Sequence, residues 1–348
     1  MKTTFISTHA IGESVRMNIM RSQERIAEAQ LELSTGRHAD VGVAVGGQYA
    51  SLSYLRQERE EMVVLDRSNS VLSTKLGVTQ DALEAMATSA QDFTAELLSA
   101  QGPSGPSVIK AQGETRMTML KDLLNTNFDG AYMFAGTNSG QPPMEDYFAN
   151  PTPASRASVE AAFLAEFGFT ATDPAVETIS DTDMIAFLNG AYSDLFEDPD
   201  WGTNWSSASD TKPTVRISST ETVDGAVSAN DEAFRKLASV FAAATDLGTL
   251  DLNPNTFEAM AHWLAERTGQ AVQDVSVVQA QVGTVEGRIA DAVDRIQTQR
   301  EVLDLRIGDI EGVDAFEASA RVTSLLTQIE TSYAVTSRIQ QLSILNFL

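Results

Sequence analysis

The chain has 348 residues, 43% of them hydrophobic, and 24 Lys and Arg against 48 Asp and Glu. The formal net charge of −24 argues against binding to nucleic acid and to anionic membrane surfaces, because both require a basic patch. The absence of Cys excludes disulfides, thiol catalysis and Cys-ligated zinc, and no apolar run reaches the ~18 residues of a membrane-spanning helix.

The N-terminal stretch MKTTFISTHAIGES has no apolar segment followed by a small-residue cleavage site, so we expect no cleaved secretory signal. The composition therefore predicts a cytoplasmic protein, or one exported by a route that needs no cleaved signal.

The first flank of the chain is predicted to be helical. All ten prolines lie between Pro103 and Pro254, so residues 1–102 and 255–348 can form long uninterrupted helices. A looser heptad pattern ends at the glycine of STGR (34–37); it consists of Ile11, Val15, Ile19, Ser22, Ile26, Ala29 and Leu33. A sustained pattern follows, with nine apolar residues among eleven: Met62, Leu65, Asn69, Leu72, Leu76, Thr79, Leu83, Met86, Ala90, Phe93 and Leu97.

Such heptad spacing is typical of helices that pack at a shallow angle. The two polar exceptions, Asn69 and Thr79, either set the register or face a wet part of the seam. The segment QGPSGPS (101–107) is predicted to be a turn between helices.

The middle of the chain has a different character. Residues 129–230 contain 16 Asp and Glu against 3 Lys and Arg. TVRIS (214–218) alternates like a short strand, and residues 229–244 are predicted to form a helix capped by Asn230 or Asp231. These features indicate an inserted α+β domain that is acidic and faces solvent.

The second flank mirrors the first. Its heptad positions are Val275, Val278, Val282, Val285, Ile289, Ala292, Ile296, Gln299 and Leu303, followed by Val322, Leu325, Ile329, Tyr333, Ile339 and Leu342. Matching seams at both ends predict that the helices of the C-terminal flank pack beside those of the N-terminal flank.

The last segment, SRIQQLSILNFL (337–348), is apolar on nearly every side of a helical wheel. Its large apolar residues are Leu342, Ile344, Leu345, Phe347 and Leu348. A helix that is apolar all round is expected to be buried all round, and each such side chain contributes roughly 1.5–3 kcal/mol when buried. One partner helix covers a single stripe, so we expect burial between subunits of an assembly.

No pattern in the sequence predicts a metal site, a cofactor site or a catalytic centre. His9, His38 and His262 are widely spaced, and FEDPDWG (196–202) lacks the spacing of a calcium loop. VGVAVGGQ (41–48) is not a phosphate-binding loop, and we interpret it as a flexible joint. We therefore expect no cofactor and no enzymatic activity.

The motifs at both ends resemble those of the flagellin superfamily. IETSYAVTSRIQQLSILNFL (329–348) resembles the terminal helix of axial flagellar proteins, and LSTGRHADVG (33–42) is similar to their turn after the first helix, with ADVG in place of the commoner SDDP. NTNFDGAYMFAGTNSGQPP (125–143) and VDGAVSANDEAFRKLASV (223–240) resemble segments of the hook–filament junction family, hook-associated protein 3. The signature residues are Gly36, Asp129, Gly130, Tyr132, Phe134, Gly136 and Thr137.

The resemblance implies a mainly α fold whose long N- and C-terminal helices pair as a coiled-coil-like bundle, with an inserted α+β outer domain. Residues 1–45 and 313–348 would be terminal helices of an inner layer, 46–135 and 255–312 a helical bundle, and 136–254 the acidic insert. The residues expected at the assembly interface are Ile11, Val15, Ile19, Ile26, Leu33, Ile329, Tyr333, Ile339, Leu342, Ile344, Leu345, Phe347 and Leu348.

The implied role is a structural subunit of the bacterial flagellum that joins hook to filament as a short ring. The implied partners are further copies of the chain, the adjoining hook-associated protein, flagellin and a type III export chaperone. Export would run unfolded through the flagellar type III apparatus to the extracellular flagellum, and the ends would be disordered in the monomer. The alternatives are flagellin itself and a cytoplasmic coiled-coil adaptor.

Overall fold

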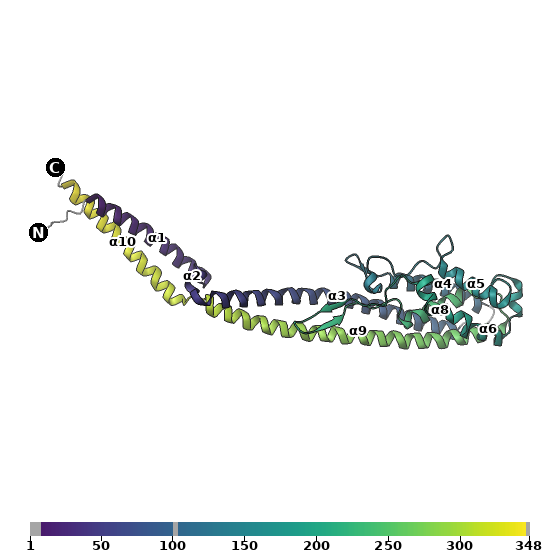
Figure 1. The fold of residues 1–348 in the computed structure, drawn as a ribbon. Helices are drawn as coiled ribbons and strands as arrows, with labels where there is room; N and C mark the ends of the chain where they lie inside the picture. Colours follow the sequence, from purple (N-terminus) through teal and green to yellow (C-terminus); the bar gives the residue numbers. More distant parts are fainter. Residues whose placement is uncertain (1–7, 100–103, 346–348) are drawn as a thin grey trace. The chain divides into compact units, whose positions relative to one another are not determined.

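The computed structural model describes residues 8–99 and 104–345, with side chains for residues 13–99 and 104–338. It is mainly helical, as the sequence predicts. The helices are α1 (Thr8–Thr35), α2 (Val41–Val45), α3 (Tyr49–Ser99), α4 (Gly105–Leu124), α5 (Ala154–Phe167), α6 (Asp181–Asn189), α7 (Ala191–Asp194), α8 (Glu232–Asp246), α9 (Pro254–Glu311) and α10 (Ala315–Leu345) (Figure 1). The strands are β1 (Asn127–Phe128), β2 (Ala131–Tyr132), β3 (Thr214–Arg216) and β4 (Thr222–Asp224), which form two antiparallel hairpins, β1–β2 and β3–β4.

The contacts divide the chain into two compact units. Unit 1 comprises residues 1–64 and 295–348, and unit 2 comprises residues 65–294. The three-part division expected from the sequence stays a prediction.

In unit 1, α1 packs along α10, and the first part of α3 packs against the last part of α9. The second contact is a small core of Leu52, Leu55, Leu303 and Ile307, against which Val41 and Val45 of α2 pack. The VGVAVGGQ stretch, interpreted from sequence as a flexible joint, forms α2 and a single 3₁₀ turn. Asp40 caps α2 by accepting a hydrogen bond from the backbone N–H of Val43 at 3.0 Å.

In unit 2, the heptad seams of α3 and α9 contribute to one large core. Asn69 and Thr79 are 0% and 2% exposed. The alternative in which these two residues face a solvent-filled part of the seam is therefore wrong. The Asn69 Nδ2 donates to the Ile217 carbonyl beside β3 at 2.9 Å. The Thr79 hydroxyl donates to the Lys75 carbonyl of its own helix at 3.0 Å.

The inserted segment is less solvent-facing than its charge predicts. Helix α8, capped by Asp231, is buried over most of its length and packs on α4. A side chain at Gly113 of α4 would collide with Thr245 and Ala244 of α8, so this glycine permits the close approach. The segment's acidic residues lie mainly in the loops and short helices around α8, whereas α8 itself is Ala- and Phe-rich and belongs to the core.

Candidate assembly interface

All but the last two of the predicted assembly residues lie on α1 and α10, which run side by side (Figure 1). Apart from Glu32, the least exposed side chains of α1 form one stripe: Val15, Ile19, Ser22, Ile26 and Ala29. The corresponding stripe of α10 consists of Ala318, Val322, Leu325, Ile329, Ser332 and Thr336. Both stripes advance in steps of three and four, which is the spacing of helices that cross at a shallow angle.

Two predicted interface residues lie off these stripes. Leu33 is 42% exposed, and its neighbour Glu32 is only 8% exposed, because α1 ends at Thr35 and Glu32 turns inward to a charged partner. Tyr333 is 51% exposed, because the register set by Leu325 and Ile329 continues at Ser332. The Tyr333 hydroxyl instead accepts a hydrogen bond from Gln23 Nε2 at 3.2 Å.

Several predicted residues fall where side chains are not described. Ile11 lies on α1, and Ile339, Leu342, Ile344 and Leu345 lie on α10, but their side chains are outside the described residues. Phe347 and Leu348 lie outside the described residues altogether. The all-round burial of the C-terminal segment therefore stays a prediction.

Helix α1 carries exposed apolar side chains on the side roughly opposite to α10, with the exposed Glu24 and Glu28 among them. Met17, Met20 and Leu31 are 51%, 62% and 50% exposed, and at 3.6 residues per turn they share one face. On α10, Leu326 and Val335 are also about half exposed. The pair α1–α10 thus leaves apolar side chains uncovered on the surface of unit 1.

The breaks between α1 and α2 and between α9 and α10 meet in a polar joint. Gly36 ends α1 with a φ of 68° and donates its N–H to the Glu32 carbonyl at 2.8 Å, a left-handed helix end that favours glycine. The His38 N–H then donates to the Glu311 carbonyl at 2.9 Å, and the Val313 N–H donates to the Gly36 carbonyl at 3.0 Å. This short antiparallel bridge ties the two chain segments together.

Two buried carboxylates hold the joint. Glu311 is 0% exposed; its Oε1 lies 2.7 Å from Arg56 Nη2, and its Oε2 lies 3.2 Å from Arg37 Nη1. Glu32 Oε2 lies 2.9 Å from Arg321 Nη1. Buried charges of this kind are retained only when they are paired, so the arginines are part of the joint's structure.

Sequence reasoning missed this ionic joint. Arg56 and Glu311 are 255 positions apart, and Arg321 and Glu32 are 289 apart. The local sequence gives one hint, because Glu32 of AQLELSTGR (29–37) lies close to the seam. Heptad periodicity alone, however, assigns Glu32 to the surface.

The signature residues of the DGAYMFAGT segment lie in unit 2 and have structural roles. Asp129 and Gly130 have φ values of 52° and 78° and form the two-residue turn of hairpin β1–β2, the geometry that favours Asp-Gly. Asn127 pairs with Tyr132 in the hairpin register, and Tyr132 is half-buried.

The rest of the signature holds distant loops together. Phe134 is 0% exposed, and its ring packs edge-on against Phe234 of α8 at 5.5 Å. Gly136 has a φ of 59°, and a side chain there would collide with the Ser209 carbonyl. The Thr137 N–H donates to the Thr211 carbonyl at 3.0 Å. The segment therefore fastens the 209–211 loop to the core.

The described residues contain no group of three or more His, Asp or Glu that could hold a metal ion. In FEDPDWG, Asp198 is exposed and its carboxylate pairs with Arg235 at 2.9 Å, whereas Trp201 is fully buried. His38 lies 3.5 Å from Glu32, and His262 lies 4.0 Å from Glu258. None of the helices that the structure describes is both long enough and apolar enough to span a bilayer.

Comparison with known proteins agrees with this architecture. Residues 6–139 match the bacterial flagellin N-terminal helical region, and residues 265–348 match the bacterial flagellin C-terminal helical region. No curated protein matches the chain with significance.

Among solved structures, the chain is similar to a Vibrio parahaemolyticus protein provisionally named as a flagellar hook-associated protein, with a TM-score of 0.51 and 11% identity. The similarity covers 75% of this chain and 96% of that one, and at this identity it shows a common fold. The two flagellin regions together span more than half of the chain, in the order and at the ends where flagellins carry them, and the protein is a member of the flagellin superfamily.

Proposed function

We propose that this protein is the structural subunit that joins the flagellar hook to the filament as a short ring. Membership of a family of structural, non-enzymatic flagellar proteins supports the general role. The junction role is supported by the DGAYMFAGT signature and by the fold shared with a protein named as hook-associated.

The observation that carries the proposal is that α1 exposes large apolar side chains on the face opposite to its contact with α10. One face packs on α10, while Met17, Met20 and Leu31 remain about half exposed on the other. Burying a large apolar side chain contributes roughly 1.5–3 kcal/mol, so three of them supply a substantial drive for association. The α1–α10 pair is suited to be one element of a continuous helical layer built from many copies.

The distribution of charge supports the same arrangement. Unit 1 contains 12 Lys and Arg against 15 Asp and Glu, whereas unit 2 contains 12 against 33. Like charges repel when copies come together, so the nearly neutral unit is the one that can pack closely. Unit 2, with its large negative charge, is suited to the solvent-facing side of an assembly.

The proposed partners follow from this position. They are further copies of the chain in the ring, the adjoining hook-associated protein on one side and flagellin on the other. Export would use the flagellar type III apparatus, and a chaperone would cover the apolar C-terminal segment by binding it as a helix in a groove. The interface residues of α1 and α10 would then become buried on assembly.

Deletion of the gene in its own host tests the role. We expect hooks without filaments and flagellin released into the medium, because filament subunits would have no platform on which to assemble. Normal filaments on the deletion strain would refute the junction role. Loss of flagellin itself, with purified protein that extends seeded filaments indefinitely, would identify the bulk filament subunit instead.

The outer face of α1 gives a second test. The variant Met17→Gln, Met20→Gln, Leu31→Gln should fail to assemble while its monomer unfolds as the parent does, since these side chains contact solvent in the single chain. Ala29→Asp is the matched contrast: Ala29 is 1% exposed, so this change should destabilise the α1–α10 pair itself. Equal loss of monomer stability in both variants would argue against an outward-facing interface.

A further inference from the structure

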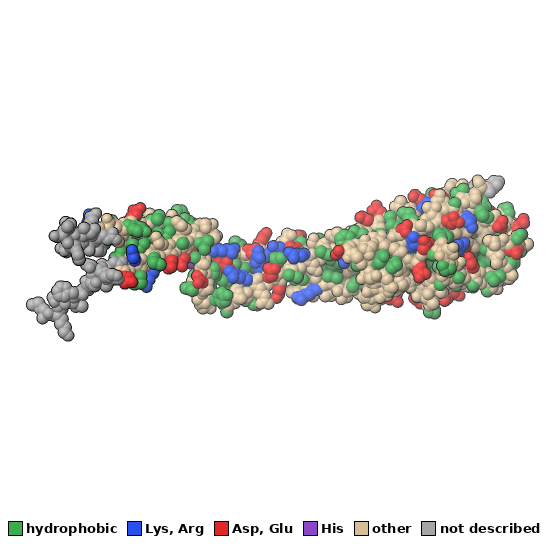
Figure 2. Space-filling view, turned by 90° about the horizontal axis from the view of Figure 1, so that it is seen from above, with side chains coloured by type: hydrophobic (Ala, Val, Ile, Leu, Met, Phe, Trp, Pro, Cys, Tyr) green, Lys and Arg blue, Asp and Glu red, His purple; other side chains and the backbone are tan. Residues whose placement is uncertain are grey.

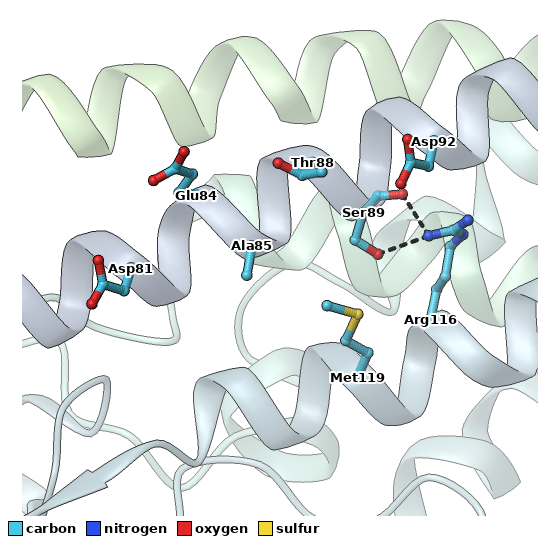
Figure 3. A pocket seen from close by; sticks show the side chains of 8 residues that line it. All are labelled: Asp81, Glu84, Ala85, Thr88, Ser89, Asp92, Arg116 and Met119. Carbon is cyan, nitrogen blue, oxygen red and sulfur yellow. Dashed lines mark hydrogen bonds between the residues drawn. The ribbon is translucent and has the colours of Figure 1, made fainter.

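A groove lies between α3 and α4 in unit 2 and has no role in the fold described above. Its volume is about 420 Å³. From α3 it is lined by Asp81, Ala85, Thr88 and Asp92, and from α4 by Arg116 and Met119 (Figure 3). The groove therefore has carboxylates toward its two ends, with the apolar Ala85 and Met119 and the hydroxyl of Thr88 between them.

The positive charge of Arg116 is already satisfied at the wall of the groove. Arg116 is 9% exposed; its Nη1 donates to the Ser89 carbonyl at 2.8 Å and to the Ser89 hydroxyl at 3.0 Å. Its Nη2 lies 2.9 Å from Glu96 Oε1. The charge that an incoming group meets is thus that of Asp81, Glu84 and Asp92, all of which are exposed.

The chemistry of the groove selects an occupant that is cationic at its ends and apolar between them. Met119 is 38% exposed and, beside Ala85, offers an apolar surface on which an aliphatic stem or a branched side chain can rest. Arginine suits the rim, because its stem packs on apolar surface while its planar head pairs with carboxylates. A helix that presents arginines at the right interval would fill the groove.

The chain itself carries such a helix face. On α9, Arg295, Gln299, Val302 and Arg306 advance in steps of four, three and four, and all four are exposed. On α3, Asp81, Ala85, Thr88 and Asp92 advance in the same steps. At a rise of 1.5 Å per residue, each stripe places its two charged ends about 16 Å apart.

We propose that the α3–α4 groove of one copy receives the Arg295–Arg306 stripe of α9 from a second copy. Each arginine pairs with one aspartate, and Val302 packs against Ala85 and Met119. The α9 stripe belongs to unit 1. Figure 2 shows that Lys and Arg side chains gather over the part of α3 and α9 in this unit, as a surface that binds carboxylates requires. The inference rests on the proposed function, in which copies of the chain lie next to one another in a ring.

Cross-linking between isotopically distinct copies tests the contact directly. Full-length R306K protein labelled with ¹⁵N is mixed with unlabelled parent protein and treated with a zero-length carbodiimide, which joins an amine to a carboxylate. We expect a cross-link from position 306 of the labelled copy to Asp81, Glu84 or Asp92 of the unlabelled copy. Cross-links to other carboxylates only, within one copy only, or none at all would overturn the proposal.

Charge reversal provides an independent measurement. Asp81→Arg with Asp92→Arg, or Arg295→Glu with Arg306→Glu, should each weaken self-association in sedimentation experiments by about tenfold or more, since like charges then face each other. Mixing the two variants should restore it. The control, Glu145→Arg with Glu166→Arg, changes the net charge equally at exposed sites away from the groove and should not show rescue by the α9 variant.

Failure of this contact can be separated from failure of the junction role. Arg295 has interactions within its own chain, so thermal unfolding of each variant must match the parent before association is compared. If deletion of the gene leaves filaments intact while the two reversed variants rescue one another, the groove contact stands and the junction role fails. If deletion removes filaments but mixing gives no rescue, the groove proposal alone is wrong.

Discussion

Glu311, at the end of α9, is fully buried with its Oε1 2.7 Å from Nη2 of Arg56 on α3. The Arg56 Nε also donates to the same oxygen at 2.7 Å, so two nitrogens of the guanidinium contact one carboxylate oxygen. Arg37 lies beside the second oxygen. This pairing holds the bridge between residues 36–38 and 311–313.

Removal of both arginines should open that joint. In the variant Arg37→Ala, Arg56→Ala, the Glu311 carboxylate stays buried without a cation, which costs about 3–5 kcal/mol. Hydrogen exchange at the His38 and Val313 amides, which form the bridge, should accelerate accordingly. Arg59→Ala is the control, because Arg59 pairs with Asp304, a half-exposed partner, and exposed pairs contribute only about 0.2–1 kcal/mol. Equal acceleration in both variants would contradict the role of Glu311.

Asn69 and Thr79 should respond differently to apolar replacement. Asn69→Leu deprives the Ile217 carbonyl of its donor and should cost about 1–3 kcal/mol, with faster exchange of the β3–β4 amides. Thr79→Val removes a hydroxyl that bonds only its own helix, so a loss below about 1 kcal/mol is expected. Urea unfolding measures both. A larger effect at Thr79 would show that the hairpin does not depend on Asn69.

Two glycines of the signature segment form a matched pair for alanine substitution. Gly130 and Gly136 both have positive φ, so alanine at either site costs about 1–2 kcal/mol in backbone strain. Only at Gly136 does the added Cβ meet backbone, the carbonyls of Ser209 and Thr211. Gly136→Ala should therefore lower the free energy of unfolding by more than about 3 kcal/mol, and Gly130→Ala by far less. Similar losses would mean that the 209–211 loop moves away freely.

Alkaline pH should unfold unit 2 through its buried tyrosines. Burial, and then the nearby charge of Asp246, raise the pKa values of Tyr147 and Tyr192 well above the ordinary value of 10. Below that value both the folded and the unfolded chain hold these protons. Above it the unfolded chain releases them first, so the free energy of unfolding falls as pH rises, by about 1.4 kcal/mol per pH unit for each tyrosine.

Tyr192→Phe separates this effect from other alkaline titrations. It removes the hydrogen bond that the Tyr192 hydroxyl donates to the Ser239 carbonyl at 2.5 Å, which should cost about 0.5–1.5 kcal/mol near neutral pH. Above pH ~10 it should also make the free energy of unfolding fall less steeply with pH, by the contribution of one proton. Urea titrations at several pH values, with phenolate absorbance as a second probe, measure both quantities. An unchanged slope would show that Tyr192 ionises in the folded protein.

Much of the helical architecture follows from local sequence. Heptad spacing correctly identified the buried face of α3 from Leu72 to Leu97, because a 3.6-residue period fixes which side chains share a face. It also identified most of the buried face of α9, but it was wrong at Gln299, which is exposed. Turn chemistry likewise indicated the break at Gly36 and a helix cap at Asn230 or Asp231, of which Asp231 is the residue that caps α8. These are properties of a few consecutive residues, and no distant partner is needed to establish them.

The exact limits of the seams depended on distant partners. Leu33 and Glu32 are adjacent, and periodicity places Leu33 on the seam, yet Glu32 is the one enclosed, because Arg321 and the turn at residues 36–39 meet its carboxylate. Asn69 interrupts an apolar stripe of α3, and the sequence alone does not show why. The structure explains its burial, because its amide donates to the carbonyl of the distant Ile217.

The sequence by itself determined the helical fold, the apolar faces and the kinship with flagellins, since periodicity and short motifs are local. Only the tertiary structure decided that Glu32 and Glu311 are buried, that α8 belongs to the core, and that α3 and α4 leave an acidic groove. Each of these depends on side chains brought together from far apart in the chain. The free energy of burying a charge or covering an apolar face is set by that neighbour, and a local pattern does not specify it.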